Sequence, residues 1–155
     1  MNKYVSYTSL ESKLVTESKA LKNKINSIIK LDFKKQKEKF VTDIDFIGWN
    51  WENIQYAEIL YKNYLFLIAK YRESEPHLPP STDIDDFWHG HILDTQRYTD
   101  DCVRIFGTMI HHNPFFGYGT TEAEKLLSAS FERTQELYTY EFGAPIFEVR
   151  ERLNT

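Results

Sequence analysis

The sequence predicts an all-α fold, a single-domain helical bundle of about five to seven helices. Apolar residues recur at spacings of three, four and seven, which is typical of amphipathic helices. Capping patterns precede these runs, and glycine or proline follows them. No segment alternates polar and apolar residues as a half-buried strand does. Because 155 residues can form one domain with its own core, we treat residues 1–155 as a single helical domain.

The first forty residues are expected to form a long helix and a shorter one. Residues 8–11 have the T-x-x-E pattern of a capping box. Apolar residues then follow at helical spacing from Leu10 to Ile29, which predicts one long amphipathic helix. Asp32 is expected to cap a shorter basic helix. Gly48 and its β-branched neighbours weaken the helical pattern, so a break is expected before residue 50.

Residues 50–72 are predicted to form the central buried helix. Apolar and aromatic side chains cover nearly every face of this segment, which contains no glycine or proline. Lys62 and Asn63 interrupt it, so it is too polar to span a membrane. Residues 75–80 contain three prolines and are expected to form a loop.

The last helices are marked by T-x-x-D and T-x-x-E capping patterns at residues 82–85 and 121–124. Thr95 is expected to cap the helix between them, which should end at Gly107. Residues 108–119 contain a proline and two glycines and should be irregular. A glycine and a proline just after residue 142 are expected to stop the final helix.

Charge is unevenly distributed along the chain. The formal net charge is −4, but residues 1–40 carry ten lysines and four acids, whereas the remaining residues are strongly acidic. A basic arm for an anionic partner is one interpretation, and a solvated helix face is the simpler one. The acidic remainder argues against nucleic-acid binding.

The cysteine count and the N-terminal sequence predict the compartment. A single cysteine, Cys102, excludes an internal disulfide framework and suits a reducing environment. The first residues contain no long apolar run, so we expect neither a signal peptide nor a membrane span. We therefore expect a cytoplasmic protein.

Residues 78–117 contain four of the five histidines and the only cysteine, which points to a site. Histidine is the commonest metal ligand. Asp85 and His89 are four residues apart and share a helix face, whereas His89 and His91 would point to nearly opposite faces. Gly90 between the two histidines indicates either a local distortion of the helix or the close approach of a neighbouring helix or a substrate.

A loop histidine could complete a metal site on this helix. If the loop after residue 107 folds back, His112 would approach His89 or His91. We predict a site for a divalent transition metal (zinc, iron or copper) formed by His89, His91, His112 and Asp85, with an open position for water or substrate. Two imidazole nitrogens on a tetrahedral zinc ion lie about 3.3 Å apart. The substrate would be an unknown small molecule or peptide.

Three further residues are candidates for acid–base or supporting roles: Tyr98, Asp101 and Cys102. Taken alone, a single cysteine is more typical of a small buried hydrophobe. The alternative function is a non-catalytic protein- or ligand-binding module. In that case the His, Trp and Asp side chains form a structural network, and partners bind the aromatic loop at residues 115–118.

The motif D-D-F-W-H-G-H-I-L at residues 85–93, followed by Tyr98, Asp101-Cys102, Gly107 and His112, resembles the glycine-rich domain-containing protein-like family of plants and bacteria. The family pattern is D-x-x-W-H-x-H-x-L followed by Y-x-x-D-C, a glycine and a histidine. The resemblance covers about residues 76–147, and the first seventy residues match only as generic helices. Asn113 stands where the family often has an acid. The resemblance implies a domain and a site without indicating a reaction.

Overall fold

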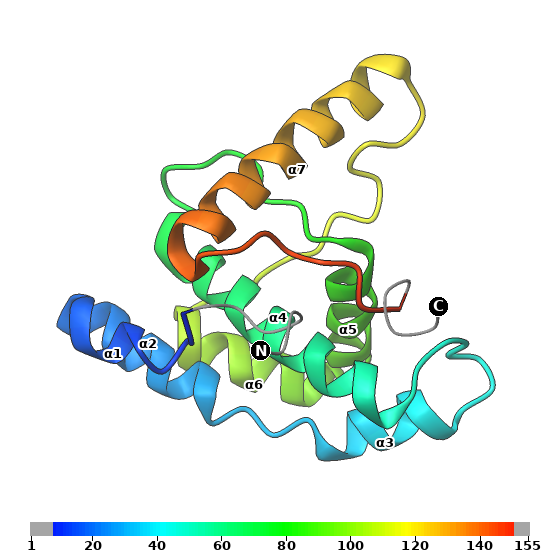
Figure 1. The fold of residues 1–155 in the computed structure, drawn as a ribbon, viewed down its shortest axis with the longest axis horizontal. Coiled ribbons are helices and arrows are strands. Elements are labelled where there is room, and N and C mark those ends of the chain that lie inside the picture. The colour runs from blue at the N-terminus through cyan, green and yellow to red at the C-terminus, as the bar shows by residue number, and fades with distance from the viewer. Residues whose placement is uncertain (1–7, 151–155) are drawn as a thin grey trace.

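The all-α prediction is confirmed by a computed structural model of the chain, which describes residues 8–150 (Figure 1). Within these residues there are seven helices and no strand, in agreement with the predicted five to seven helices. The helices are α1 (Lys13–Thr16), α2 (Lys19–Ile29), α3 (Lys34–Thr42), α4 (Trp51–Tyr71), α5 (Thr82–Leu93), α6 (Thr95–Phe106) and α7 (Thr121–Phe142).

Helix α4 is the central buried helix that the sequence predicts. Eleven of its 21 residues are buried, and α2, α3, α5 and α7 all pack against it. Asn50 caps its N-terminus in a reciprocal capping box with Asn53, whose backbone N–H donates to the Asn50 side chain at 2.9 Å. Because α4 contacts α5 directly, it supports the helix that carries the histidine motif.

The predicted long helix over residues 10–29 is wrong, because the chain breaks between α1 and α2. Glu17 adopts an extended conformation, and the hydroxyl of Ser18 caps α2 by accepting from the Leu21 N–H at 3.3 Å. The Glu17 carboxylate also pairs with Lys70 at 2.7 Å. A local cap and a tertiary ion pair therefore stabilise the break. The capping-box pattern at residues 8–11 does not start a helix.

Several predicted helix starts are displaced by one residue. The cap of α5 is Ser81, which accepts from the Ile84 N–H at 3.3 Å, and the cap of α7 is Thr120. Thr95 is the first residue of α6 rather than its cap. Each threonine predicted as a cap therefore lies just inside its helix.

Two predicted helix ends are confirmed. Gly107 and Gly143 follow α6 and α7 in the left-handed region, with φ values of 74° and 81°. Glycine adopts this conformation without a Cβ penalty, so it ends both helices. The turn at Gly107 redirects the chain into the loop that carries His112.

Gly90 is required by the close approach of α3 to α5. Helix α5 is continuous through this residue, which excludes the local distortion. A Cβ at Gly90 would lie 2.4 Å from Cε2 of Phe40 and 2.8 Å from Nε2 of Gln36. Gln36 also donates to the Phe87 carbonyl at 2.8 Å. The structure thus selects helix packing as the reason for a glycine between the two histidines.

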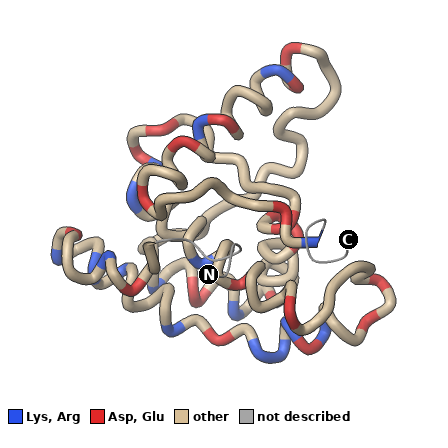
Figure 2. The backbone as a smooth tube through the Cα atoms, viewed as in Figure 1, with Lys and Arg blue, Asp and Glu red and all other residues tan. Residues whose placement is uncertain are grey.

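From residue 8 onward, the basic N-terminal segment forms helices that pack on the body of the domain (Figure 2). Lys37 pairs with Glu58 at 2.7 Å, and Lys62 pairs with the same carboxylate at 3.3 Å. Lys34, Lys35 and Lys39 of α3 are exposed, which fits the interpretation of a solvated helix face. No helix in the described part of the chain has the length and apolar character needed to cross a membrane.

Candidate functional site

The first turns of α5 place a carboxylate and an imidazole side by side. Asp85 and His89 are one helical turn apart, as the i, i+4 spacing predicts. The Asp85 Oδ2 and His89 Nε2 atoms are 3.5 Å apart. The His89 side chain is 48% exposed and that of Asp85 is 32% exposed. Both groups are therefore accessible to an ion or a small molecule.

The loop after α6 brings His112 to this pair. The Tyr98 hydroxyl donates to the Ile110 carbonyl at 2.5 Å, and the His112 ring packs edge-on against Trp88 with 4.6 Å between ring centroids. These contacts fix the loop, and the His112 side chain is only 14% exposed. Contacts that restrict the orientation of the His112 ring are typical of a histidine that binds a metal ion.

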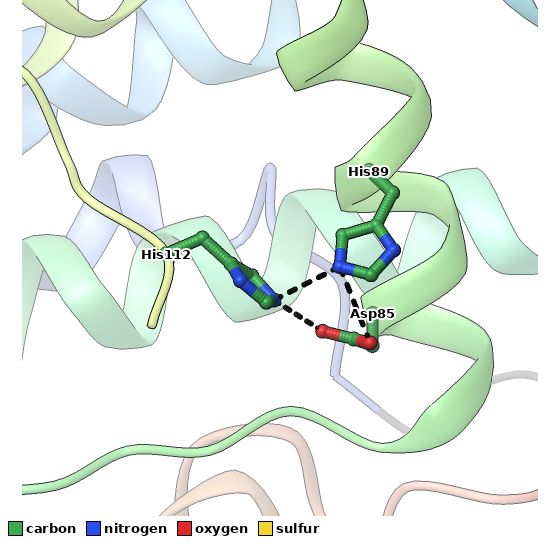
Figure 3. A group of neighbouring side chains, drawn as sticks. All are labelled: Asp85, His89 and His112. Atoms are coloured by element: carbon green, nitrogen blue, oxygen red, sulfur yellow. Dashed lines mark hydrogen bonds and ion pairs between the residues drawn. The ribbon is translucent and has the colours of Figure 1, made fainter. Parts of the chain in front are cut away.

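The three side chains converge on one point (Figure 3). The His112 Nε2 atom lies 2.5 Å from Oδ1 of Asp85 and 3.2 Å from Nε2 of His89. One donor atom from each residue can be chosen so that all three lie within 4.8 Å of one another. The predicted approach of His112 to a histidine of the motif helix is therefore present, and the two nitrogens have nearly the separation expected for ligands of one zinc ion.

His91 is not part of this group. Its Nδ1 lies 2.8 Å from the Tyr61 hydroxyl, and its Nε2 lies 2.8 Å from Oδ2 of Asp101. Burial lowers the pKa of His91 below its usual value, although the hydrogen bond to Asp101 opposes that shift. Helical spacing predicted nearly opposite faces for His89 and His91, but His91 was still included among the predicted metal ligands. Its ring instead joins a buried network with Tyr61 and Asp101.

The three residues predicted for acid–base or supporting roles lie behind the group. The Tyr98 hydroxyl accepts from Nε1 of Trp88 at 2.9 Å, so Tyr98 links α5 to the His112 loop. Asp101 is buried and faces His91. Cys102 is also buried, and burial raises the pKa of its thiol. Of the three residues, Tyr98 has the most direct connection to the Asp85, His89 and His112 group, because it hydrogen-bonds to Trp88 and Trp88 packs against His112.

A cavity of about 450 Å³ opens beside Asp85 and His112. Its walls come from the loop before α5, from α5 itself and from the loop after α6. Tyr64 of α4 and Leu127 of α7 complete them. The sequence analysis did not identify this cavity. Prolines at both loops were the available signal, but Leu127 is distant in sequence from the histidine motif.

Arg150 is a second feature that the sequence did not reveal. Its guanidinium donates to Oδ1 of Asp83 at 2.7 Å and to Oδ2 of Asp86 at 2.6 Å. It also stacks over the Trp49 ring, with 4.5 Å to the centroid. Arg150 therefore balances the two acids that flank Asp85, and it fixes the start of α5. An arginine so far from the motif in sequence gives no signal of such a contact.

Comparison with known proteins identifies the family. The model of the glycine-rich domain-containing protein-like family matches residues 3–101. Glycine-rich domain-containing protein 1 of Arabidopsis thaliana is 30% identical over an alignment of 96 residues, which covers 58% of this chain and 11% of the plant protein. The chain thus spans about a ninth of the length of that relative. No solved structure matches the chain significantly.

The matched segment differs from the one expected. It begins at residue 3 rather than near residue 76, so the N-terminal helices are part of the matched domain and more than generic helices. It contains Asp85 and His89 but ends before His112. The assignment of His112 to the site therefore rests on the geometry of this chain. The chain belongs to the glycine-rich domain-containing protein-like family.

Proposed function

We propose that this protein binds a divalent transition metal ion through Asp85, His89 and His112. The observation that carries the proposal is the position of His112, whose Nε2 atom lies 3.2 Å from that of His89 and 2.5 Å from Asp85 Oδ1. Residues from two separate elements thus direct three donor atoms at a common point. Two imidazoles and one carboxylate suit zinc and iron(II), and imidazole also suits copper.

Three protein ligands would leave at least one coordination position open. Asp85 and His112 both line the neighbouring cavity, so we propose that this position faces it and admits water or substrate. There the ion would lower the pKa of a bound water or polarise a carbonyl group. The chain would then be a small metalloenzyme in which Asp85, His89 and His112 bind the ion and fix its position.

Tyr98 is proposed as a positioning residue for this site. Its hydroxyl joins Trp88, on which the His112 ring packs, to the Ile110 carbonyl in the same loop. The partners that orient metal ligands typically change metal affinity by 10- to 100-fold when they are removed. Asp101 would support the site through its hydrogen bond to His91, and Cys102 through its contacts with Tyr98 and the Ile110 backbone. We keep a cytoplasmic location as part of the proposal, since the buried free thiol of Cys102 suits a reducing compartment.

A non-catalytic binding module is the second candidate. The observation that favours it is that the Asp85–His112 contact also satisfies the criteria of a hydrogen bond, which needs no ion. The Tyr61–His91–Asp101 network is complete in the same way. Phe115, which is 72% exposed, would then contribute to a partner surface.

Thermal unfolding with and without metal distinguishes the two functions. A ligand at a hundredfold excess over its dissociation constant stabilises the folded protein by about 2.7 kcal/mol. For a chain of this size that corresponds to a rise in Tm of roughly 5–10 °C. We expect this rise with zinc, copper or anaerobic iron(II) at pH 7.5 and little rise at pH 5, because the imidazoles must be neutral to bind.

The matched variants are His112→Ala and His111→Ala. His111 is an exposed neighbour in the same loop and is outside the three-residue group. The metalloenzyme proposal requires His112→Ala to abolish the metal-dependent rise and His111→Ala to retain it. A wild-type protein whose Tm does not respond to any of the three metals would support the binding module instead.

A further inference from the structure

The cavity beside Asp85 and His112 has a group of apolar side chains among its walls, next to polar ones. Leu78, Pro80, Trp88, Phe116 and Leu127 present rings or aliphatic carbon to a space of about 450 Å³. This volume lies within the range of small-molecule sites, which are commonly 300–1,000 Å³. The chemistry of these walls therefore indicates what kind of ligand the candidate metal site would receive.

The cavity offers no cationic side chain to an anionic ligand. No lysine or arginine is among its lining residues, and Asp85 is the only carboxylate there. A carboxylate or phosphate inside the cavity would have to rely on a histidine or on a bound ion for its counter-charge. Transferring a charged group from water without a partner is costly. The cavity therefore disfavours charged groups away from the metal position.

Several polar atoms in the walls are already engaged within the protein. The Tyr64 hydroxyl donates to the Leu78 carbonyl at 2.5 Å, and Nε1 of Trp88 donates to Tyr98. The Ser81 hydroxyl accepts from the Ile84 N–H at the start of α5. These groups therefore present mainly the apolar parts of their side chains to a ligand.

We propose that the cavity binds a ligand whose compact apolar body, aromatic or aliphatic, is uncharged and is joined to one metal-coordinating group. The body packs against Trp88, Phe116 and Leu127, and the coordinating group reaches the position beside Asp85 and His112. This inference rests on the proposed function for the coordinating group alone. The apolar preference of the cavity stands independently of the metal.

The first test uses protein loaded with one equivalent of zinc and three hydroxamates that share the metal-binding group. Benzohydroxamate is expected to bind roughly tenfold or more tightly than acetohydroxamate, because its ring is buried in the cavity. 4-Carboxybenzohydroxamate is expected to lose most of that gain, since its second anionic group meets no cation. Equal affinity for benzohydroxamate and acetohydroxamate in zinc-loaded protein would overturn the inference.

The matched variants are Leu127→Asp, which places a carboxylate in the cavity wall, and Leu126→Asp, which changes the preceding residue outside the wall. Leu127→Asp should remove the preference for benzohydroxamate, and Leu126→Asp should keep it. If Leu127→Asp unfolds the protein, Phe116→Ala replaces it and should reduce the preference. Retention of the full preference in the wall variants would contradict the assignment of the cavity.

A metal-free arm separates failure of the inference from failure of the metal proposal. Ligand-observed NMR on metal-free protein compares benzamide with acetamide. The two amides differ only in their apolar group, a phenyl ring or a methyl group, and no metal ion is present to coordinate either of them. Saturation transfer to benzamide that Leu127→Asp abolishes and Leu126→Asp preserves would support the cavity assignment even if no metal binds. Absence of transfer to benzamide in the wild type would also reject the inference.

Discussion

The Nε2 atom of His112 lies 2.5 Å from Oδ1 of Asp85, although 27 residues separate them in the sequence. The contact depends on a turn at Gly107, with its φ of 74°, and on packing of the His112 ring against Trp88. A loop and a helix are thereby held in one geometry that a metal ion or a shared proton would stabilise further.

Replacement of Gly90 by alanine should destabilise the protein. The new Cβ would lie 2.4 Å from the buried ring of Phe40, and overpacking of this kind costs about 1–3 kcal/mol. Alanine recovers about 1 kcal/mol of helix propensity, so we expect a net loss of roughly 1 kcal/mol in urea unfolding. Ser128→Ala, at an exposed site on α7, should not lower stability. A more stable Gly90→Ala protein would show that α3 does not pack this closely on α5.

Replacement of Tyr98 by phenylalanine should weaken both the fold and metal binding. The Trp88 N–H and the Ile110 carbonyl would lose their shared partner, which costs about 1–3 kcal/mol for buried groups. Metal affinity, measured by calorimetry, should fall about tenfold or more as the His112 loop loosens. Tyr140→Phe is the control, because Tyr140 is 79% exposed. Unchanged metal affinity in Tyr98→Phe would remove Tyr98 from its positioning role.

Loss of Arg150 should cost far more than loss of a surface arginine. Arg150→Met would leave the buried Asp83 carboxylate with only the Val149 N–H as a described partner. Removing one member of a buried ion pair costs about 3–5 kcal/mol. Arg133→Met breaks an exposed pair with Glu75 and should cost at most about 1 kcal/mol. Similar unfolding free energies for the two variants would argue against the role of Arg150.

The buried network around His91 should make stability depend on pH. Because burial lowers the pKa of His91, His91 takes up its proton at a higher pH in the unfolded chain than in the folded protein. The stabilisation is complete above the unfolded pKa of about 6.5 and is lost as pH falls toward the folded pKa. Denaturant unfolding from pH 8 to 5 with a chelator present should therefore show a decline that is weaker in His91→Gln. Equal pH slopes in the two proteins would exclude His91 as its source.

The fold was largely predictable because its signals are local. The apolar pattern predicted the two ends of α4 to within one residue of those observed. Glycines correctly marked the ends of α6 and α7. The break between α1 and α2 was missed because the ion pair of Glu17 with Lys70 joins residues far apart in sequence. The predicted cap positions were wrong by one residue because adjacent hydroxyl residues, such as Ser81 and Thr82, are equally good candidates for a helix cap.

The candidate site was predictable only in part. Spacing on a helix placed Asp85 and His89 on one face and separated His91 from them. The motif resemblance singled out His112, but its contact with Asp85 and the engagement of His91 with Tyr61 and Asp101 depend on tertiary packing. The contribution of Leu127 to the cavity wall and the hydrogen bond from Arg150 to Asp83 also depend on tertiary packing. Such contacts leave no pattern in a single sequence.

Metal analysis of protein purified without a histidine tag tests the central claim most directly. Elemental analysis by mass spectrometry, after equilibration with zinc and removal of loosely bound ions, should give about one equivalent per chain for the wild type and for His111→Ala. Asp85→Ala, His89→Ala and His112→Ala should each lose most of that metal while retaining helical circular dichroism. A wild-type protein without stoichiometric metal, or a His112→Ala variant that retains the full equivalent, would contradict the account.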